Sequence, residues 1–432
     1  MRILIAGAGH GGLVAGAMLA KAGHEVTLLE QKPREALGHD WEDRFTFSVL
    51  AEAPGIPEDA LPQDVWRVRG DCTFISPDGR TRVNVHYPPE NAQRVMWRVP
   101  LVRMLLDHAE ACGVRCRFET TVVAGLIRGT RVTGLRTQNG DLSADLVIDS
   151  AGVFSPVRTK LPASFGIEKA PRRGDLFYAW RGYFNRLPDV PAARIPFEVY
   201  LRHAGEAGLS WFCTNPDSVD VLIGRVDPLS PEKLQTHLER FRRSHPWMGE
   251  TLVHGGQYAV IPVRRPLARM VADGYAAVGD SAFMTTPMNG MGIDLSLRAG
   301  KLLAETVCAS SACSAADLWR YNRDFHRLYG GSTAKNEGLK NALLSMSEQD
   351  VNFLFAARVI ESADLSGAGQ TMSANALLGK FSRGMQRPAA FAAVLRGLLR
   401  GAQTAAQYKA APERFSPDAV NRWSRRIANG RN

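Results

Sequence analysis

The stretch RILIAGAGHGGLVAGAMLAKAGHEVTLLE, residues 2–30, decides the fold of this chain. Its first five residues form a short apolar run rich in branched side chains, which predicts a buried parallel strand. A glycine-rich turn follows, and the apolar residues after it recur at helical spacing. A second apolar run ends at Glu30. We therefore predict a strand–helix–strand unit.

The glycine-rich turn is typical of dinucleotide binding. Gly7 permits the tight turn, Gly9 allows the backbone to approach a pyrophosphate, and Gly12 allows close packing of helix on strand. The helix N-terminus presents free N–H groups and a positive dipole end to phosphate. Glu30 is placed to accept a hydrogen bond from ribose hydroxyls, and its charge favours FAD or NAD over NADP. The predicted contacts in the turn are Gly7, Ala8, Gly9, His10, Gly11 and Gly12.

A second motif lies far downstream, in GYAAVGDSAFMTTPMNGMGIDLSLRAGKLLAETV at residues 274–307. It predicts a strand that ends at Gly279 and Asp280, a loop, and a long helix that begins near Gly292. Asp280 is placed to bind a ribityl hydroxyl. Pro287, Gly290 and Gly292 shape a loop whose N–H groups face a flavin ring or phosphate. Taken alone, the motif fits equally well a tight loop before a helix.

The two motifs together resemble the FAD-binding pattern of glutathione-reductase-type flavoproteins. More narrowly, the chain resembles the superfamily of p-hydroxybenzoate-hydroxylase-type monooxygenases, flavin-dependent halogenases and geranylgeranyl reductases. Arg98, Leu101 and Leu105 match that superfamily's Arg-x-x-Leu-x-x-x-Leu helix start. By this resemblance, Arg98 contacts the flavin nucleotide and the backbone of Val122 contacts adenine.

Departures from the superfamily pattern bear on the reaction type. Hydroxylases carry an Asp-Gly pair, associated with pyridine-nucleotide handling, where this chain has Ala151 and Gly152. The segment VIDSAG looks more like the VIDASG of halogenases and geranylgeranyl reductases. No WxWxIP halogenase segment is present, and the Tyr-x-Trp-x-Phe-Pro signature of geranylgeranyl reductases is matched only at Trp211.

The residues between the flavin segments predict a separate antiparallel sheet. Strand patterns flank the DG turn at residues 78–79, and the stretches 176–187, 197–215 and 219–227 indicate three further strands. Aromatic residues are dense there, so one face of the sheet is a candidate lining for a hydrophobic or aromatic substrate, although each ring is also a plain core candidate. The candidate substrate-pocket residues are Tyr183, Trp211 and Asn289.

Composition and charge exclude several classes of protein. With 45% hydrophobic and 22% charged residues, the 432-residue chain is neither disordered nor membrane-spanning. Its six scattered cysteines and isolated histidines predict free thiols, no metal site and a cytoplasmic location.

The net charge of +10 is concentrated at the C-terminus. Residues 381–432 hold ten basic and two acidic side chains, which leaves the preceding body nearly neutral. The apolar spacing of residues 391–399 predicts a helix there, with Arg396 and Arg400 four residues apart. Its basic edge is either solvated or meets anionic lipid in a peripheral membrane contact. No nucleic-acid-binding module is recognisable.

We therefore expect an α/β fold: a Rossmann-like FAD-binding domain, an inserted antiparallel substrate domain and a helical C-terminal extension. The expected boundaries are 1–55, 91–165 and 255–312 for the first, 56–90 and 166–254 for the second, and 313–432 for the third. The resemblance implies an FAD-dependent oxidoreductase that transfers a hydride from reduced flavin to a C=C bond of a hydrophobic substrate, with NAD(P)H as a candidate donor. A flavin monooxygenase and an electron-transfer flavoprotein without its own substrate remain alternatives.

Overall fold

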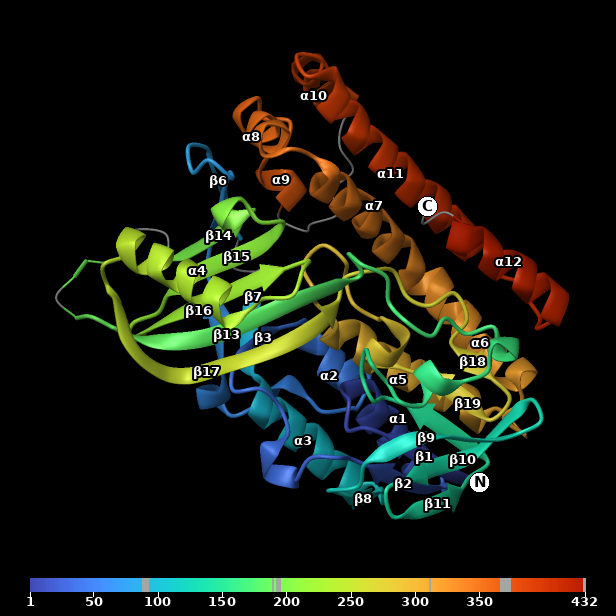
Figure 1. Cartoon of the computed structure of the whole chain (residues 1–432). Helices are drawn as coiled ribbons and strands as arrows, with labels where there is room; N and C mark the ends of the chain where they lie inside the picture. Colours follow the sequence, from blue (N-terminus) through green and yellow to red (C-terminus); the bar gives the residue numbers. More distant parts are fainter. Residues whose placement is uncertain (88–92, 189, 192–195, 311, 366–373, 430–432) are drawn as a thin grey trace.

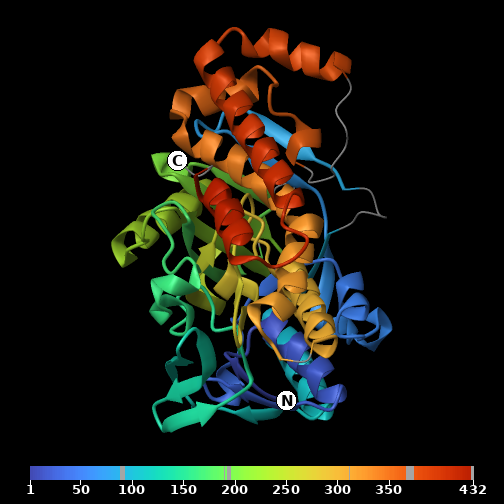
Figure 2. The same cartoon turned by 90° about the vertical axis from the view of Figure 1, so that its right-hand side faces the viewer.

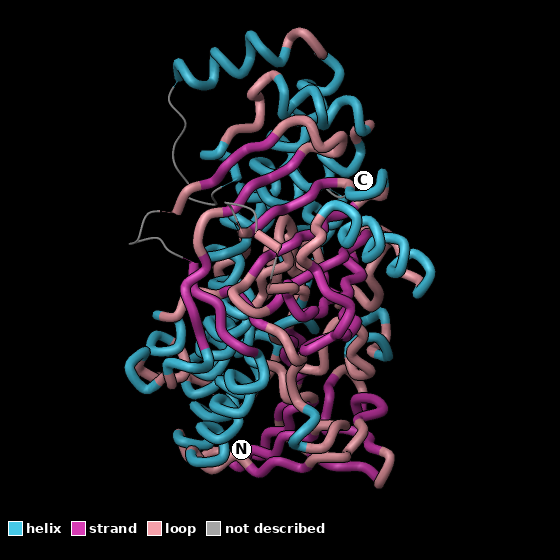
Figure 3. Tube along the Cα trace, turned by 90° about the vertical axis from the view of Figure 1, so that its left-hand side faces the viewer, coloured by secondary structure: helices cyan, strands magenta, loops and turns pink. Residues whose placement is uncertain are grey.

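A computed structural model describes residues 1–87, 93–188, 190–191, 196–310, 312–365 and 374–429. Two large sheets and a layer of C-terminal helices make up the molecule (Figure 1). Figure 3 shows one group of strands near the N-terminus and a second, larger group in the middle of the chain trace. This architecture confirms the predicted fold class.

The first large sheet has six strands in the order β18-β19-β12-β1-β2-β8, all parallel except the edge strand β18. Its central strands are apolar runs because helices cover them, and Ile5 of β1 lies between Leu28 and Ile148. Its strands are β1 (Arg2–Ala6), β2 (Glu25–Leu29), β8 (Arg115–Arg117), β12 (Leu146–Asp149), β18 (Val271–Ala272) and β19 (Tyr275–Ala277).

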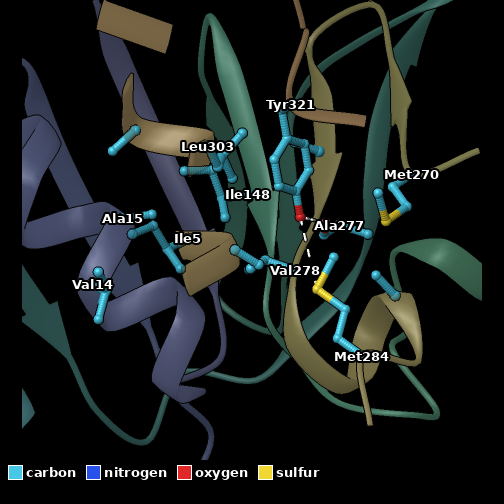
Figure 4. Packing of buried hydrophobic residues seen from close by; sticks show 14 of the residues in the cluster. Ile5, Val14, Ala15, Ile148, Met270, Ala277, Val278, Met284, Leu303 and Tyr321 are labelled. Atoms are coloured by element: carbon cyan, nitrogen blue, oxygen red, sulfur yellow. Dashed lines mark hydrogen bonds between the residues drawn. The ribbon is translucent and has the colours of Figure 1, made fainter. Parts of the chain in front are cut away.

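Three helices belong to the same domain as this sheet. They are α1 (His10–Lys21), α3 (Arg98–Ala111) and α5 (Ile293–Cys308). Helix α1 packs against β1, β2 and both other helices. Figure 4 shows the packing of Val14 and Ala15 of α1, Leu303 of α5 and Ile5 of β1. In the same view the Tyr321 hydroxyl of α6 (Ala315–Phe325) donates to the carbonyl of Ala277 at 2.8 Å. These contacts fix the ends of β1 and β19, from which both sequence motifs emerge.

A three-stranded antiparallel meander, in the order β11-β10-β9, follows the first part of this domain. It consists of β9 (Val122–Arg128), β10 (Arg131–Thr137) and β11 (Gly140–Ser143). The predicted Asn139-Gly140 turn joins β10 to β11, where Thr137 pairs with Gly140.

The second large sheet has seven strands in the order β17-β13-β16-β15-β14-β5-β6. Its strands are β5 (Cys72–Ile75), β6 (Arg82–Val85), β13 (Leu176–Arg186), β14 (Phe197–Leu201), β15 (Gly208–Thr214), β16 (Ser218–Arg225) and β17 (Met248–Pro262). A small sheet in the order β3-β7-β4 joins it to the first domain; it comprises β3 (Glu42–Arg44), β4 (Trp66–Arg69) and β7 (Gln93–Trp97).

Two expectations for the substrate sheet were wrong. Residues 197–215 form two strands, β14 and β15, because the chain reverses at a short turn in which Arg202 and Ala204 adopt left-handed φ angles of 50° and 62°. The boundary expected at residue 255 falls inside β17, which continues to Pro262 in the seven-stranded sheet because it pairs along its length with β13.

The aromatic residues of the seven-stranded sheet divide between its two faces. Trp180, Phe184 and Phe212 pack in one buried cluster with Phe241 of helix α4 (Pro231–Ser244). The opposite face carries Tyr183, Phe197 and Trp211. Part of the aromatic density noted in the sequence therefore serves the core under α4, and part of it lies on the opposite face.

The C-terminal region is helical, as predicted. After α6 and a π-helical turn at residues 326–330, the chain forms helices that extend from the first domain to the seven-stranded sheet (Figures 1 and 2). Leu343, Leu354 and Phe391 share an apolar cluster with Phe74 and Leu201 of that sheet. The remaining helices are α2 (Ser48–Glu52), α7 (Gly331–Ser345), α8 (Glu348–Ala356), α9 (Ser362–Leu365), α10 (Ala374–Gly384), α11 (Pro388–Lys409) and α12 (Pro417–Asn429).

Candidate active site

The turn between β1 and α1 is held against the end of β12. Gly7 has a φ of 85°, and a Cβ atom at Gly9 would lie 2.4 Å from Ser150 Oγ. The Gly12 amide donates to Ser150 Oγ at 3.2 Å, and both groups are buried. Ser150 is thus the residue that shapes this turn. The sequence pattern located the glycines but not Ser150, because the two segments are joined only by tertiary contact.

The N-terminus of α1 presents unpartnered polar groups. Among the described residues, no acceptor lies within hydrogen-bond distance of the amides of Gly9, His10 and Gly11. His10 Nε2 is buried and likewise has no partner there. Burial, and then the charge of Arg98, lowers the pKa of His10 to about 4, so the ring is neutral at physiological pH. Neutral donors and free amides suit an anionic ligand at this helix end.

Glu30 lies directly after β2 with both carboxylate oxygens engaged. Oε2 accepts from the Ala8 amide at 2.9 Å and Oε1 from the Lys32 amide at 2.9 Å. Each oxygen keeps a lone pair, so contact with a ribose remains chemically available. The Glu30 carbonyl, just after the end of β2, accepts from the Thr120 amide at 2.8 Å. Val122, the first residue of β9, follows Thr120 by two positions and so lies near the end of β2.

Asp280 lies in a short turn, residues 279–282, after β19. Its carboxylate receives no hydrogen bond from any described residue, and burial raises its pKa to about 6 against the opposing charge of Arg98. At neutral pH it is therefore a charged, partly buried acceptor without a donor. A hydroxyl-bearing ligand would supply that donor.

The loop between Asp280 and α5 is built by its own backbone. The Thr286 carbonyl accepts from Gly290 at 2.9 Å, and the Thr286 amide donates to Met291 at 2.7 Å. Asn289 is exposed, and its Oδ1 accepts from the Met291 amide at 3.2 Å. Pro287 is buried, and Gly292 is the N-cap of α5. The predicted helix start at Gly292 is confirmed.

Arg98 begins α3 and is paired with Asp43, a residue that the sequence analysis missed. Its Nη2 donates to Asp43 Oδ1 at 2.8 Å, and its Nε also donates to that carboxylate. Burial tends to raise the pKa of Asp43, but the Arg98 charge outweighs it and the pKa lies below its ordinary value. Arg98 Nη1 also donates to His39 Nδ1 at 3.2 Å, and the guanidinium lies over the Trp41 ring.

The three candidate substrate residues lie in two places. Tyr183 is buried, its hydroxyl oxygen accepts from the Glu42 amide at 3.0 Å, and burial raises its pKa well above the ordinary value. Trp211 is half-buried and donates through Nε1 to Asp220 at 3.2 Å. These two side chains lie on one sheet face, whereas Asn289 belongs to the α5 loop.

Asp220 organises a buried polar cluster on the same face. It accepts from Arg181 at 2.8 and 2.7 Å and from Arg69 at 2.6 Å, in addition to Trp211. Burial opposes its ionisation, yet the charge of Arg181 lowers the pKa of Asp220 to about 2. Beside this cluster the face is apolar, where Cys72, Phe197 and Val199 pack together with Leu365 of α9 against them.

Other kinds of centre are not found in the described part of the chain. No three His, Cys, Asp or Glu side chains there are arranged to hold a metal ion. All six cysteines are free thiols. The arrangement therefore offers unpartnered polar groups at the N-termini of α1 and α5, together with an apolar sheet face.

The unpartnered groups fit FAD. The free amides of α1 suit its phosphates, Asp280 suits a hydroxyl of its ribityl chain, and the amides of Ile293 and Asp294 at the start of α5 have no acceptor among the described residues. Without a ligand, these polar groups would remain unpaired and would lower the free energy of unfolding.

Comparison with known proteins agrees with this geometry. The sequence profile of the FAD binding domain family matches residues 1–317. The chain is 24% identical over 388 residues to the digeranylgeranylglycerophospholipid reductase of Sulfolobus acidocaldarius, covering 85% of this chain and 83% of the relative. It is 26% identical over 353 residues to the kynurenine 3-monooxygenase of Salinispora arenicola, covering 73% and 74%.

A solved structure shows the same fold. A geranylgeranyl bacteriochlorophyll reductase-like protein from Thermoplasma acidophilum superposes with a TM-score of 0.70 at 18% identity, over 90% of this chain and 97% of the other. The matched profile includes both the Gly7–Gly12 turn and Asp280, whose unpartnered groups fit the cofactor. The chain therefore belongs to the FAD binding domain family and is an FAD-dependent oxidoreductase.

Proposed function

We propose that this protein reduces C=C bonds in a hydrophobic, isoprenoid-type lipid chain. The observation that carries the proposal is its similarity, over 85% of its length, to a reductase of digeranylgeranylglycerophospholipid. Ala151 in the VIDSAG segment, where hydroxylases carry Asp, supports the same choice. The monooxygenase relative keeps oxygen transfer as the competing reaction for the experiment below.

When bound and reduced, FAD supplies a hydride to one carbon of the double bond, and a proton on the other carbon completes the addition. The role of the protein's own residues is to position the cofactor and the substrate, not to take part in the bond-forming step. The α1 amides and the α5 loop would hold the cofactor, and Asp43 keeps Arg98 in place. We propose NAD(P)H as the electron donor.

The substrate would lie on the apolar part of the seven-stranded sheet, between β5, β14 and β15 and the C-terminal helices. Trp211 and Leu209 adjoin Cys72 and Val199 in that cluster, and Leu365 of α9 closes it. The buried Asp220 cluster occupies the neighbouring part of the face, and its carboxylate is already engaged by Arg181, Arg69 and Trp211. This division favours an apolar chain over a polar ligand.

The test is single-turnover chemistry with defined products. The holoprotein is reduced anaerobically with dithionite and mixed with digeranylgeranylglycerophospholipid in detergent, and the lipid is analysed by mass spectrometry. We expect reoxidation of the flavin together with a gain of two hydrogens per reduced bond. Repeating the reaction under ¹⁸O₂ distinguishes the competitor, because incorporation of one ¹⁸O with no hydrogenated product would replace the reductase assignment by a monooxygenase.

The donor is tested in the same apparatus. Anaerobic mixing with NADH or NADPH should bleach the flavin absorbance within the time of a turnover. If neither nucleotide reduces the flavin while dithionite does, the donor proposal is wrong and the reductase proposal is unaffected.

We also propose that this protein is cytoplasmic and meets its substrate at a membrane surface through its basic C-terminal region. No helix in the described residues has the length and apolar content to cross a bilayer. Support comes from the charge of residues 381–432, which hold ten basic and two acidic side chains. A peripheral contact with a membrane requires a defined surface of the protein that binds the lipid.

A further inference from the structure

Helices α10 and α11 expose an apolar strip. Of the thirteen large apolar side chains exposed among the described residues, four lie in these two helices and a fifth, Met385, lies in the turn between them. On α11, Leu395, Leu398 and Leu399 follow helical spacing and lie on one side. We define the strip by its members Phe381, Met385, Leu395, Leu398 and Leu399, which are 49%, 50%, 44%, 44% and 61% exposed.

The strip is continuous between the helices. The Phe381 ring of α10 meets the Phe391 ring of α11 edge-on at 5.5 Å between centroids. Phe391 in turn belongs to the apolar cluster that includes Phe74 and Leu201 of the substrate sheet. The exposed strip is therefore joined through packed side chains to the part of the molecule where we place the substrate.

The strip cannot turn inward, because glycines fix the other side of α11. A Cβ atom on Gly397 would lie 2.5 Å from the Gly338 carbonyl oxygen of α7, and one on Gly338 would lie 2.2 Å from that of Gly397. This close backbone contact leaves no room for leucine. Figures 1 and 2 show α11 on the outer side of α7, along the surface of the molecule.

Basic side chains flank the strip. Arg396 and Arg400 are exposed, lie one turn apart, and have no ion-pair partner among the described residues. Both line a groove between α7 and α11 together with Arg265 and the single acid Glu337. Glu337 is already paired with the buried Arg265 at 3.3 Å, so the groove mouth keeps an excess of positive charge.

We propose that the apolar strip and Arg396 and Arg400 form a docking surface for an anionic lipid bilayer. This inference rests on the proposed function, which places the substrate in a membrane. The leucines and Phe381 would enter the acyl boundary while the two arginines contact lipid phosphates beside it, the arrangement of an interfacial amphipathic helix. Charge complementarity selects a bilayer over a second copy of this chain, because two copies would bring the same arginines together.

Co-sedimentation of the full-length holoprotein with vesicles tests this surface. We expect binding to vesicles of equal parts phosphatidylcholine and phosphatidylglycerol and little binding to phosphatidylcholine alone. The double variant Arg396→Glu/Arg400→Glu and the triple variant Leu395→Ser/Leu398→Ser/Leu399→Ser should each weaken binding by at least about tenfold. Matched controls are Arg80→Glu/Arg128→Glu and Leu252→Ser/Val253→Ser, which change exposed residues elsewhere and should bind as the unmodified protein does.

Three outcomes overturn the inference: no binding by the unmodified protein, equal binding to both vesicles, or retained binding by both strip variants. A fall in molecular mass for the leucine variant in light scattering, without loss of vesicle binding, would assign the strip to self-association instead. Lipid reduction in detergent separates the two proposals. If the protein reduces the lipid in detergent but does not bind vesicles, only the proposed docking surface is wrong. If it does not reduce the lipid in detergent, the proposed function is wrong.

Discussion

Two aspartates in this molecule lie near arginine side chains and have pKa values shifted in opposite directions. Asp220, on the seven-stranded sheet, accepts hydrogen bonds from Arg181, Arg69 and Trp211, and its pKa falls to about 2. Asp280, before α5, accepts none from any described residue, and burial raises its pKa to about 6. Both lie near a guanidinium, so proximity of charge alone does not account for the difference.

What differs is whether the surrounding chain completes the hydrogen bonds. We call Asp220, Arg181, Arg69 and Trp211 the closed cluster, since its acid is saturated by protein donors. We call His10, Asp43, Arg98 and Asp280 the open cluster, because His10 Nε2 and the Asp280 carboxylate lack partners among the described residues. A closed cluster stabilises the fold, whereas an open one is completed by a ligand.

The largest effect is expected from opening the closed cluster. Asp220→Ala leaves two buried guanidinium groups without their acid and should lower the free energy of unfolding by about 3–5 kcal/mol. Denaturant unfolding of the FAD-loaded protein measures this loss. The matched control is Asp141→Ala, which breaks an exposed pair with Arg136 and should leave the free energy of unfolding nearly unchanged. Equal costs for the two variants would contradict the distinction between the clusters.

The next effect concerns the turn that carries the open cluster. Gly9→Val places side-chain atoms against Ser150, where even a Cβ would lie 2.4 Å from Oγ, and displaces the α1 amides. Loss of two charge-assisted hydrogen bonds to phosphate should weaken FAD binding by at least about a hundredfold. Flavin fluorescence titration of the apoprotein measures the change. Gly70→Ala, at a glycine with open space around it, is the control and should bind FAD normally.

Local spacing explains which parts of this site could be predicted from sequence. Gly7, Glu30 and Asp280 each lie at a strand end, and the requirement for a tight turn or an acid is encoded within a few residues. Asp43 could not be predicted as the partner of Arg98, because the two are separated by 55 positions and meet only when β3 pairs with β7. Ser150 was missed for the same reason.

The substrate sheet was harder to predict than the nucleotide site. The alternating pattern identified its strands, but the reversal between β14 and β15 depends on left-handed φ angles at Arg202 and Ala204, residue types that do not mark such a turn in sequence. The boundary at residue 255 failed because pairing with β13, and not local composition, carries β17 on to Pro262. The alternating pattern of apolar residues also distinguishes the two faces of the sheet, but it does not show which face packs under α4.

A third prediction separates the two aspartates directly. Asp280→Asn removes a carboxylate whose pKa is raised in the folded state, so it should stabilise the apoprotein. The penalty in the unmodified protein is absent below the unfolded pKa near 4, develops as pH rises towards 6 and stays constant above it. The gain should therefore reach up to about 3 kcal/mol above pH 6 and vanish at about pH 4.

The same variant should bind FAD about tenfold more weakly, because the charged acceptor is lost. Thermal unfolding of apoprotein and titration with FAD measure the two effects. Asp220→Asn is the comparison, and it should lose stability at every pH above about 4 without any gain. A destabilised Asp280→Asn apoprotein would mean that this carboxylate has a protein donor after all.

The smallest effect is expected at Asn289, the third substrate-pocket candidate from the sequence. Its side chain is exposed and makes one hydrogen bond, to the Met291 amide, while Thr286 holds the loop through backbone bonds. Asn289→Ala should therefore change the free energy of unfolding by about 0.5 kcal/mol or less and FAD affinity by less than about threefold. A tenfold loss of FAD affinity at unchanged stability would show that the open cluster extends to this side chain, because a loop held by its backbone alone does not transmit so large an effect.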